Sequence, residues 1–112
     1  MKAISTHVLD TSRGCAAVGM YVCLFFWQDG AWVQWLDAYT DDDGRVADWP
    51  EGKQLKEGRY RLAFDVKKYL EAEGLPVFYP RVDVEFLVAD ASQHYHVPLL
   101  MSPYGYSTYR GS

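Results

Sequence analysis

The sequence lacks the long apolar segment that a membrane-spanning helix needs. No run of about eighteen consecutive apolar residues occurs among its 112 residues. The first residues, Met-Lys-Ala-Ile-Ser-Thr-His, contain no apolar stretch followed by a small-residue cleavage site, as a secretory signal would. The last residues are not a Ser-Lys-Leu peroxisomal address. We therefore expect no membrane partner and a cytoplasmic location.

Cysteine is scarce, and positive charge does not dominate. Cys15 and Cys23 are the only two cysteines and lack Cys-x-x-Cys spacing, so we expect no structural disulfide. Cys23 is expected to be a small core residue of an apolar strand, and Cys15 to lie in a loop. The net charge is −4, with 23% charged residues of mixed sign, whereas a nucleic-acid binder carries a basic stripe. We therefore expect no nucleic-acid partner.

Internal repeats, linkers and low-complexity segments are also missing. Together with the length, this predicts a single domain over residues 1–112. A chain of this size leaves about a third of its unfolded surface exposed, so oligomerisation would stabilise it. Aromatic residues, in contrast, are abundant at 16%, which is typical of a β-rich protein.

Alternation of apolar and polar residues recurs along the chain and predicts short strands. Asp29-Gly30 separates two of them and is the usual signal for a type I′ hairpin turn. We expect strands at residues 4–10, 20–28, 31–40, 59–65 and 82–88 and in a final pair on either side of a turn at 102–105.

One segment predicts a helix. Asp65 can cap its N-terminus, residues 66–73 are good helix formers, and Gly74 and Pro76 end it. Several short strands with one short helix indicate an all-β fold, and their spacing is typical of an antiparallel β-sandwich.

The histidines are few, and their positions suggest chemistry. They are His7, His94 and His96. His94 and His96 stand two residues apart, so in a strand both side chains point to one face. A strand histidine is usually just a half-buried polar residue, but a largely neutral imidazole can also take a proton from water. The His-x-His spacing also occurs in zinc sites, with His7 as a third ligand. However, no cysteine or carboxylate stands beside these histidines in sequence, so we expect no metal.

Arg45 directly follows the acidic turn Asp41-Asp42-Asp43-Gly44. Its guanidinium could simply pair with Asp42 or Asp43 in solvent. Alternatively, the turn holds it in place to bind a planar, electron-rich ligand through paired N–H donors. The sequence leaves both interpretations open.

The chain ends on Tyr109-Arg110-Gly111-Ser112, directly after an expected strand. This tail is either a polar chain end without a role or a segment that folds over a site and presents hydroxyls and backbone groups to a small ring. No Gly-x-Ser-x-Gly elbow occurs, and the expected fold is not α/β. We therefore expect direct attack by water and no covalent intermediate on a serine.

Three blocks of the sequence resemble the 5-hydroxyisourate hydrolases, the enzyme branch of the transthyretin-like family. They are residues 5–11 (Ser-Thr-His-Val-Leu-Asp-Thr), residues 43–45 (Asp-Gly-Arg) and residues 94–112, whose Tyr-Arg-Gly-Ser ending is that branch's hallmark. The resemblance covers essentially the whole chain. It implies a transthyretin-like antiparallel sandwich of two four-stranded sheets, metal-free hydrolysis without a cofactor, and a homotetramer, a dimer of dimers with sites between the dimers.

The resemblance also implies roles for individual residues. Catalytic positions of the family match His7, Arg45, His96 and Ser112. Substrate-binding positions match His7, Arg45, Tyr109, Arg110, Gly111 and Ser112. His94 matches no assigned position, and we expect it to have a structural or supporting role. The implied reaction is hydrolysis of the small molecule 5-hydroxyisourate, an unstable product of urate oxidation, to 2-oxo-4-hydroxy-4-carboxy-5-ureidoimidazoline by histidine-activated water.

The main alternative is a transthyretin-type carrier of a small aromatic ligand, because a carrier would share the fold and the tetramer. The carrier branch lacks the two histidines, the arginine and the Tyr-Arg-Gly-Ser ending that this sequence contains. A purely structural interaction domain would not need polar groups from three separate segments. We therefore expect an enzyme.

Overall fold

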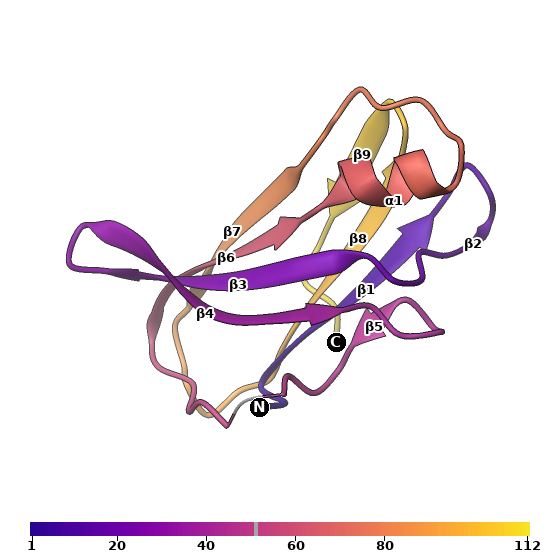
Figure 1. The fold of residues 1–112 in the computed structure, drawn as a ribbon. Coiled ribbons are helices and arrows are strands. Elements are labelled where there is room, and N and C mark those ends of the chain that lie inside the picture. Colours follow the sequence, from indigo (N-terminus) through magenta and orange to yellow (C-terminus); the bar gives the residue numbers. More distant parts are fainter. Residues whose placement is uncertain (51) are drawn as a thin grey trace.

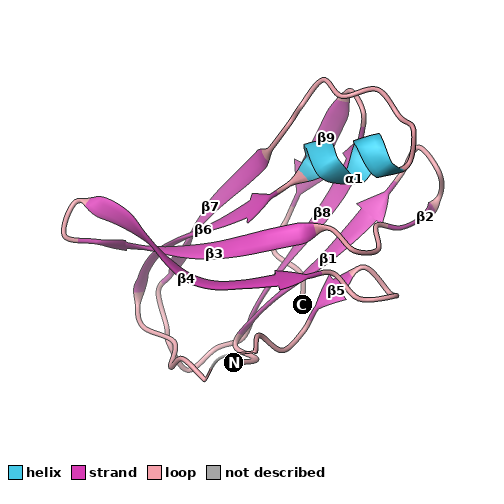
Figure 2. Cartoon of the chain, in the orientation of Figure 1, coloured by secondary structure: helices cyan, strands magenta, loops and turns pink. Residues whose placement is uncertain are grey.

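The computed structural model, which describes residues 1–50 and 52–112, consists of two packed β-sheets and a short helix (Figure 1). Strands account for most of its regular structure, as Figure 2 shows by colour. In chain order the elements are β1 (Ile4–Asp10), β2 (Cys15–Ala16), β3 (Tyr21–Gln28), β4 (Ala31–Tyr39), β5 (Arg45–Val46), β6 (Gly58–Phe64), α1 (Val66–Ala72), β7 (Val82–Val88), β8 (Tyr95–Ser102) and β9 (Gly105–Thr108).

The first sheet has the strand order β2-β1-β8-β9. β5 pairs with β1 on the same edge as β2, next to Thr6 and His7. The second sheet has the order β4-β3-β6-β7. The predicted sandwich with one short helix is confirmed. Two details were not expected from the sequence. β1 and β8 run parallel, and the two-residue strands β2 and β5 extend the first sheet to five strands. Cys15 therefore lies in a short strand rather than in a loop, because its backbone pairs with that of Asp10.

The alternation in β1 decides which residues face the core. Ile4, Thr6 and Val8 are each 0% exposed and face the second sheet. Ser5 and His7 point to the opposite side of the same strand, as the sequence predicts. Thr6 is accommodated in the core because its hydroxyl donates a 2.6 Å hydrogen bond to the carbonyl of Val97. β1 therefore separates an apolar interior from a polar outer face.

The hairpin between β3 and β4 follows the expected turn chemistry. Asp29 and Gly30 have φ angles of 53° and 77°, the pair of positive values that a type I′ turn requires. A register shift lies between Leu24 and Phe25 in β3. The hairpin projects to one side of the sandwich at the left of Figure 1. This pair of strands forms the edge of the second sheet farthest from β7.

The helix begins and ends as the sequence predicts. The Asp65 carboxylate accepts a 3.3 Å hydrogen bond from the backbone N–H of Lys68, which caps the N-terminus. Leu70 is completely buried and anchors the helix on the core. Within the described residues, no helix has the length and apolar character needed to cross a membrane.

Both sheets contribute to one hydrophobic cluster, which includes Leu24, Leu62 and Leu99. A buried carboxylate, that of Asp10, lies at its margin. Burial alone would raise the pKa of Asp10, but hydrogen bonds from Ser12 and Tyr69 and from nearby backbone N–H groups lower it overall. The few polar side chains in this interior, such as Thr6 and Asp10, are satisfied by hydrogen bonds within the protein.

Candidate active site

A concave surface of about 190 Å³ lies over the first sheet, near the chain end. It brings together residues from β1, β5, the start of β8 and the C-terminal tail. The lining residues are Ser5, Thr6, Arg45, Ala47, His94, His96 and Ser112. Three of the four predicted catalytic residues therefore share one surface, and the fourth, His7, lies beside it.

The pairing of strands explains this arrangement. In the parallel ladder of β1 and β8, Ser5 lies opposite His96. On the other side of β1, His7 lies opposite Arg45 of β5. Since Ser5 and His7 are two residues apart on one strand, their side chains share the outer face. Polar side chains from segments that are far apart in the sequence thus lie beside β1.

A hydrogen bond fixes the protonation pattern of His7. Its Nε2 atom lies 2.9 Å from the carbonyl oxygen of Asp43. A carbonyl can only accept, so Nε2 must carry the hydrogen, and in the neutral ring Nδ1 holds the lone pair. No second hydrogen bond to this ring occurs within the described residues. Nδ1 of His7 is therefore a free proton acceptor.

His96 is held through its other nitrogen. Its Nδ1 atom lies 2.8 Å from the hydroxyl oxygen of Ser5. Burial lowers the pKa of His96, and the nearby charge of Arg45 and the other two histidines lower it further. Because the charged form is disfavoured, His96 is mainly neutral near pH 7. In the described part of the chain, Nε2 of His96 has no hydrogen-bond partner.

The acidic turn positions the backbone of Arg45. The carboxylate of Asp41 accepts hydrogen bonds of 2.9 Å from the N–H groups of Asp43 and Arg45, and these two bonds lower its pKa. Gly44 has a φ of 76°, and a Cβ at this position would lie 2.5 Å from the carbonyl oxygen of Val8, so only glycine fits without a shift. The turn therefore holds Arg45 through the main chain and not through its charge.

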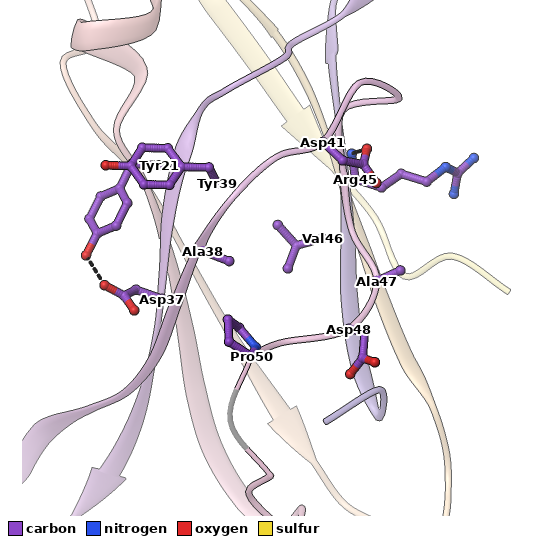
Figure 3. Close-up of a pocket in the computed structure, with 10 residues that line it drawn as sticks. All are labelled: Tyr21, Asp37, Ala38, Tyr39, Asp41, Arg45, Val46, Ala47, Asp48 and Pro50. Carbon is purple, nitrogen blue, oxygen red and sulfur yellow. Dashed lines mark hydrogen bonds between the residues drawn. The ribbon is translucent and has the colours of Figure 1, made fainter.

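The guanidinium of Arg45 is left free by this arrangement. None of the ion pairs between described residues includes Arg45, so the pairing with Asp42 or Asp43 that the sequence left open does not form. Figure 3 shows the side chain extending away from Asp41 and from the neighbouring aspartates Asp37 and Asp48. An unpaired cation beside two imidazoles can bind an electron-rich ligand.

The tail reaches the site through backbone contact with β8. The N–H of Gly111 donates a 2.7 Å hydrogen bond to the carbonyl oxygen of His96. A Cβ at position 111 would lie 2.5 Å from Cδ2 of the His96 ring, so the tail can lie this close only with glycine there. This contact brings the terminal residue, Ser112, to the concave surface.

Tyr109 and Arg110 lie elsewhere in the single chain. They line a separate concave surface of about 240 Å³ beside β7. The guanidinium of Arg110 lies 4.4 Å from the ring centroid of Tyr95 and donates a 2.9 Å hydrogen bond to the side-chain oxygen of Gln93. The structure therefore does not bring these two side chains to the concave surface that His96 lines, and their role in substrate binding stays a prediction.

Ser5 is a site residue that the sequence did not identify. Its hydroxyl lies 3.1 Å from Nε2 of His94 as well as 2.8 Å from Nδ1 of His96, so it connects the two histidines. The signal was its position two residues before His7 on the same strand face. Within the described residues, no group of three or more histidine, cysteine or carboxylate side chains is arranged to hold a metal ion.

A larger concave surface of about 590 Å³ lies at β4 and the segment after β5 (Figure 3). Its polar side chains are mostly engaged or acidic. The hydroxyl of Tyr21 donates a 2.5 Å hydrogen bond to Asp37, which raises the pKa of the tyrosine. Arg45 and Ala47 line both surfaces, but no histidine lines the larger one. Its size therefore does not make it the better candidate for acid–base chemistry.

Comparisons with known proteins identify the family to which the chain belongs. The family model of the HIUase/Transthyretin family matches residues 4–111. The chain is 46% identical over 117 residues to the 5-hydroxyisourate hydrolase of Caulobacter vibrioides, with 100% of both sequences covered. It resembles the structure of Klebsiella pneumoniae 5-hydroxyisourate hydrolase with a TM-score of 0.83 and 34% identity, over 97% of this chain and 98% of that one.

It also resembles sea bream transthyretin in complex with thyroxine, with a TM-score of 0.90 and 28% identity, over 97% of this chain and 94% of that one. The transthyretin-like fold that the sequence predicts is thereby confirmed. The higher identity to hydrolases separates the two branches that share this fold. The chain therefore belongs to the HIUase/Transthyretin family and is an enzyme of its hydrolase branch.

Proposed function

We propose that this chain hydrolyses 5-hydroxyisourate to 2-oxo-4-hydroxy-4-carboxy-5-ureidoimidazoline, as a step of urate degradation. The observation that carries the proposal is the meeting of two imidazoles and an unpaired guanidinium, from separate segments, on one outer face of the first sheet. The relative from Caulobacter vibrioides, named a 5-hydroxyisourate hydrolase, supports the choice of substrate.

In the proposed mechanism, His7 is the general base. Its Nδ1 atom is free to accept because Nε2 donates to the carbonyl of Asp43. It removes a proton from water as the water oxygen attacks a carbonyl carbon of the six-membered ring. The adjacent C–N bond then breaks, the carbonyl becomes a carboxylate, and the leaving nitrogen takes up a proton. No covalent bond to the protein forms at any stage.

Arg45 binds the ring and stabilises the charge that develops on it. A guanidinium offers parallel N–H donors, which fit the carbonyl oxygens and nitrogens of a planar ring. Because no carboxylate neutralises Arg45 within the described residues, its charge is available to the oxygen of the tetrahedral intermediate. The turn that fixes its backbone limits how far the donor must reorganise.

His96 and Ser112 complete the proposed site. The ring of His96 lines the concave surface with Nε2 free, so it can donate a hydrogen to the leaving nitrogen. Ser112 lines the same surface and can contact the substrate through its hydroxyl. Gly111 contributes by its close packing on His96 rather than by a side chain.

We further propose that the working form is a homotetramer, a dimer of dimers, formed by this single domain in the cytoplasm. The concave surface of one chain is shallow and open, and a facing subunit would enclose it. Tyr109 and Arg110, which lie apart from the histidines in one chain, would then contact substrate from the neighbouring site. No metal and no other cofactor is part of the proposal.

A transthyretin-type carrier is the second candidate, and the likeness to the thyroxine-bound sea bream protein favours it. A carrier would bind a small aromatic ligand at the same surface without changing it. Such a role gives no reason for a free acceptor nitrogen on His7 beside an unpaired Arg45. The two candidates differ in turnover, which can be measured directly.

The proposal is tested by generating 5-hydroxyisourate in situ with urate oxidase and following its ultraviolet absorbance with and without the protein. We expect faster decay, with the ureidoimidazoline product identified by carbon-13 NMR. Arg45→Ala should lower kcat/KM by about 10²- to 10³-fold, as loss of one charge-stabilising donor does elsewhere. Arg59→Ala, the same change on the second sheet, is the control and should leave kcat/KM unchanged. Decay at the spontaneous rate with a folded, tetrameric protein would favour the carrier.

A further inference from the structure

The hydroxyl of Ser5 couples the protons of two histidines. It lies 3.1 Å from Nε2 of His94 and 2.8 Å from Nδ1 of His96. A hydroxyl has one hydrogen, so it can donate to only one of these nitrogens and must accept from the other. The two rings are nearly parallel, at 13°, with centroids 6.4 Å apart. A change of protonation on one ring therefore changes the hydrogen bond that the other ring receives.

The three groups form a path from solvent to the candidate site. His94 is exposed and stands one residue before β8. Ser5 is only 6% exposed, and His96 is half-buried and lines the concave surface. Nε2 of His96, at the inner end of the path, has no partner within the described residues. A proton held by His94 can thus be passed through Ser5 to Nδ1 of His96, so that Nε2 of the same ring can release its hydrogen to the site.

The proposed reaction needs a supply of protons to His96. His7 is an acceptor when neutral, so it takes the proton of the attacking water and cannot donate in the same step. His96 must then protonate the leaving nitrogen, but burial and the charge of Arg45 disfavour its charged form, so it carries only one hydrogen near pH 7. A neutral imidazole that gives up this hydrogen becomes an anion unless its other nitrogen gains one.

We propose that His94 and Ser5 are positioning residues of a proton relay that recharges His96 during hydrolysis, an inference that rests on the function proposed above. As Nε2 of His96 gives its proton to the leaving nitrogen, the Ser5 hydroxyl gives its proton to Nδ1 of His96. Nε2 of protonated His94 in turn gives its proton to the Ser5 oxygen. His96 and Ser5 end neutral, with the hydrogen of His96 now on Nδ1, and His94 goes from cation to neutral. After the product leaves, Nε2 of His96 takes a proton from water in the site, and the hydrogens move back from Nδ1 through Ser5 to Nε2 of His94, which restores the starting state.

The charges around the path favour this direction. From the neighbouring strands, Arg45 and His7 face His96 and oppose a resting positive charge on it. At the outer end, Arg110 donates to the side chain of Gln93 and lies 3.4 Å from the carbonyl oxygen of His94. Positive charge is thus disfavoured at His96, the inner end of the path.

Two variants of His94 test whether this residue supplies a proton or only holds Ser5 in place by a hydrogen bond. His94→Gln keeps an N–H group that can donate to Ser5 but cannot release a proton. His94→Phe keeps a flat ring beside His96 and loses both abilities. We expect kcat to fall by about tenfold to a hundredfold in both, with little change in KM, since part of an acid–base contribution of 10²- to 10⁴-fold is lost. Ser5→Ala should do the same, and Ser92→Ala, in the preceding turn, should not.

The pH profile and chemical rescue give readouts that a merely structural role would not move. In the unsubstituted enzyme, the pH profile of kcat should have an alkaline limb, and this limb should be absent from His94→Gln. Added imidazolium buffer should raise the kcat of His94→Gln in proportion to its concentration, because position 94 is open to solvent. It should leave the kcat of Ser5→Ala unchanged, because the path is broken inside.

Nitrogen-15 NMR of the imidazoles tests the relay without substrate. We expect His96 to be neutral near pH 7 with its hydrogen on Nε2, in both the unsubstituted protein and His94→Gln. A hydrogen on Nδ1 instead, or a kcat profile of His94→Gln that matches the unsubstituted enzyme, would overturn the relay. Absence of any turnover in the unsubstituted enzyme would instead overturn the proposed function, so the two failures are distinguishable.

Discussion

The two sheets of this sandwich share one core but differ on their outer faces. On the second sheet, the guanidiniums of Arg59 and Arg61 lie 4.8 Å and 4.4 Å from the ring centroids of Trp27 and Trp32. Arg59 also forms a 3.0 Å ion pair with Glu85. On the first sheet, the guanidinium of Arg45 has no ion pair within the described residues. Similar residue types are thus engaged on one face and free on the other.

This difference shows that the groups available to bind and react with a ligand lie on the first sheet. Each cation of the second face already contacts an aromatic ring, which stabilises the folded chain and leaves little to offer a ligand. On the first face, hydrogen bonds orient His7 and His96 through one nitrogen each and leave the other nitrogen free. A group held in place but not fully satisfied is what a catalytic site requires.

A substitution in the shared core should have the largest effect on stability. It should not change the chemistry of either outer face. Phe64 is 0% exposed and packs from the second sheet into the common cluster. Phe64→Ala should lower the free energy of unfolding by about 3–5 kcal/mol, because it removes a large buried ring and leaves a cavity. Urea denaturation measures this loss, and the kcat of the fraction that stays folded should be nearly unchanged.

A methyl group at the tail should affect the first face alone. Gly111→Ala places a Cβ 2.5 Å from Cδ2 of His96, so the ring or the tail must move. We expect kcat/KM to fall by about tenfold or more, since small misplacements of reacting groups are costly. Stability should change little. Gly52→Ala is the control, because among the described residues nothing lies within 4 Å of a Cβ there. Equal activity of the two variants would contradict the contact.

The pH dependence of stability should carry a contribution from His96. Burial and neighbouring positive charge lower its pKa in the folded chain, so the unfolded chain binds this proton more readily. The contribution is therefore fully present above the unfolded pKa of about 6.5 and is lost as the pH falls below it. Urea denaturation between about pH 8 and pH 5 should show a smaller decline for His96→Asn than for the unsubstituted protein. An unchanged decline would argue against the lowered pKa.

The smallest effect should come from the second face. Arg61→Ala removes one cation from the ring of Trp32 and should lower the free energy of unfolding by about 0.5–1 kcal/mol. Activity should not change. A loss of turnover comparable with that of Arg45→Ala would mean that both faces contribute to the chemistry.

Much of this account could be predicted from local sequence patterns. The alternation of residues 4–10, the turn at Asp29-Gly30 and the cap at Asp65 each depend on short-range physics and are confirmed. The parallel pairing of β1 with β8 could not be predicted in this way. It joins strands that are about ninety positions apart in the sequence. No local sequence pattern shows which of the other strands will pair with a given strand.

The candidate site likewise contains residues that the sequence predicted and contacts that depend on long-range strand pairing. The resemblance of three blocks to a hydrolase family predicted the residue set, and the structure brings His7, Arg45, His96 and Ser112 together. The link through Ser5 was missed because it depends on the register that places residue 5 opposite residue 96. The position of Arg110 over Tyr95 likewise depends on how the tail crosses the sheet edge.

The most direct test of the central claim is a double-mutant cycle on His7 and His96. The rate of 5-hydroxyisourate decay would be measured for His7→Ala, for His96→Ala and for the double variant, each shown to be folded by circular dichroism. If both imidazoles serve one reaction on one face, each single change should lower kcat by about 10²- to 10⁴-fold. The double variant should then be little slower than either single variant, because the residues act as a unit. Decay at the unsubstituted rate in the folded double variant would contradict the account.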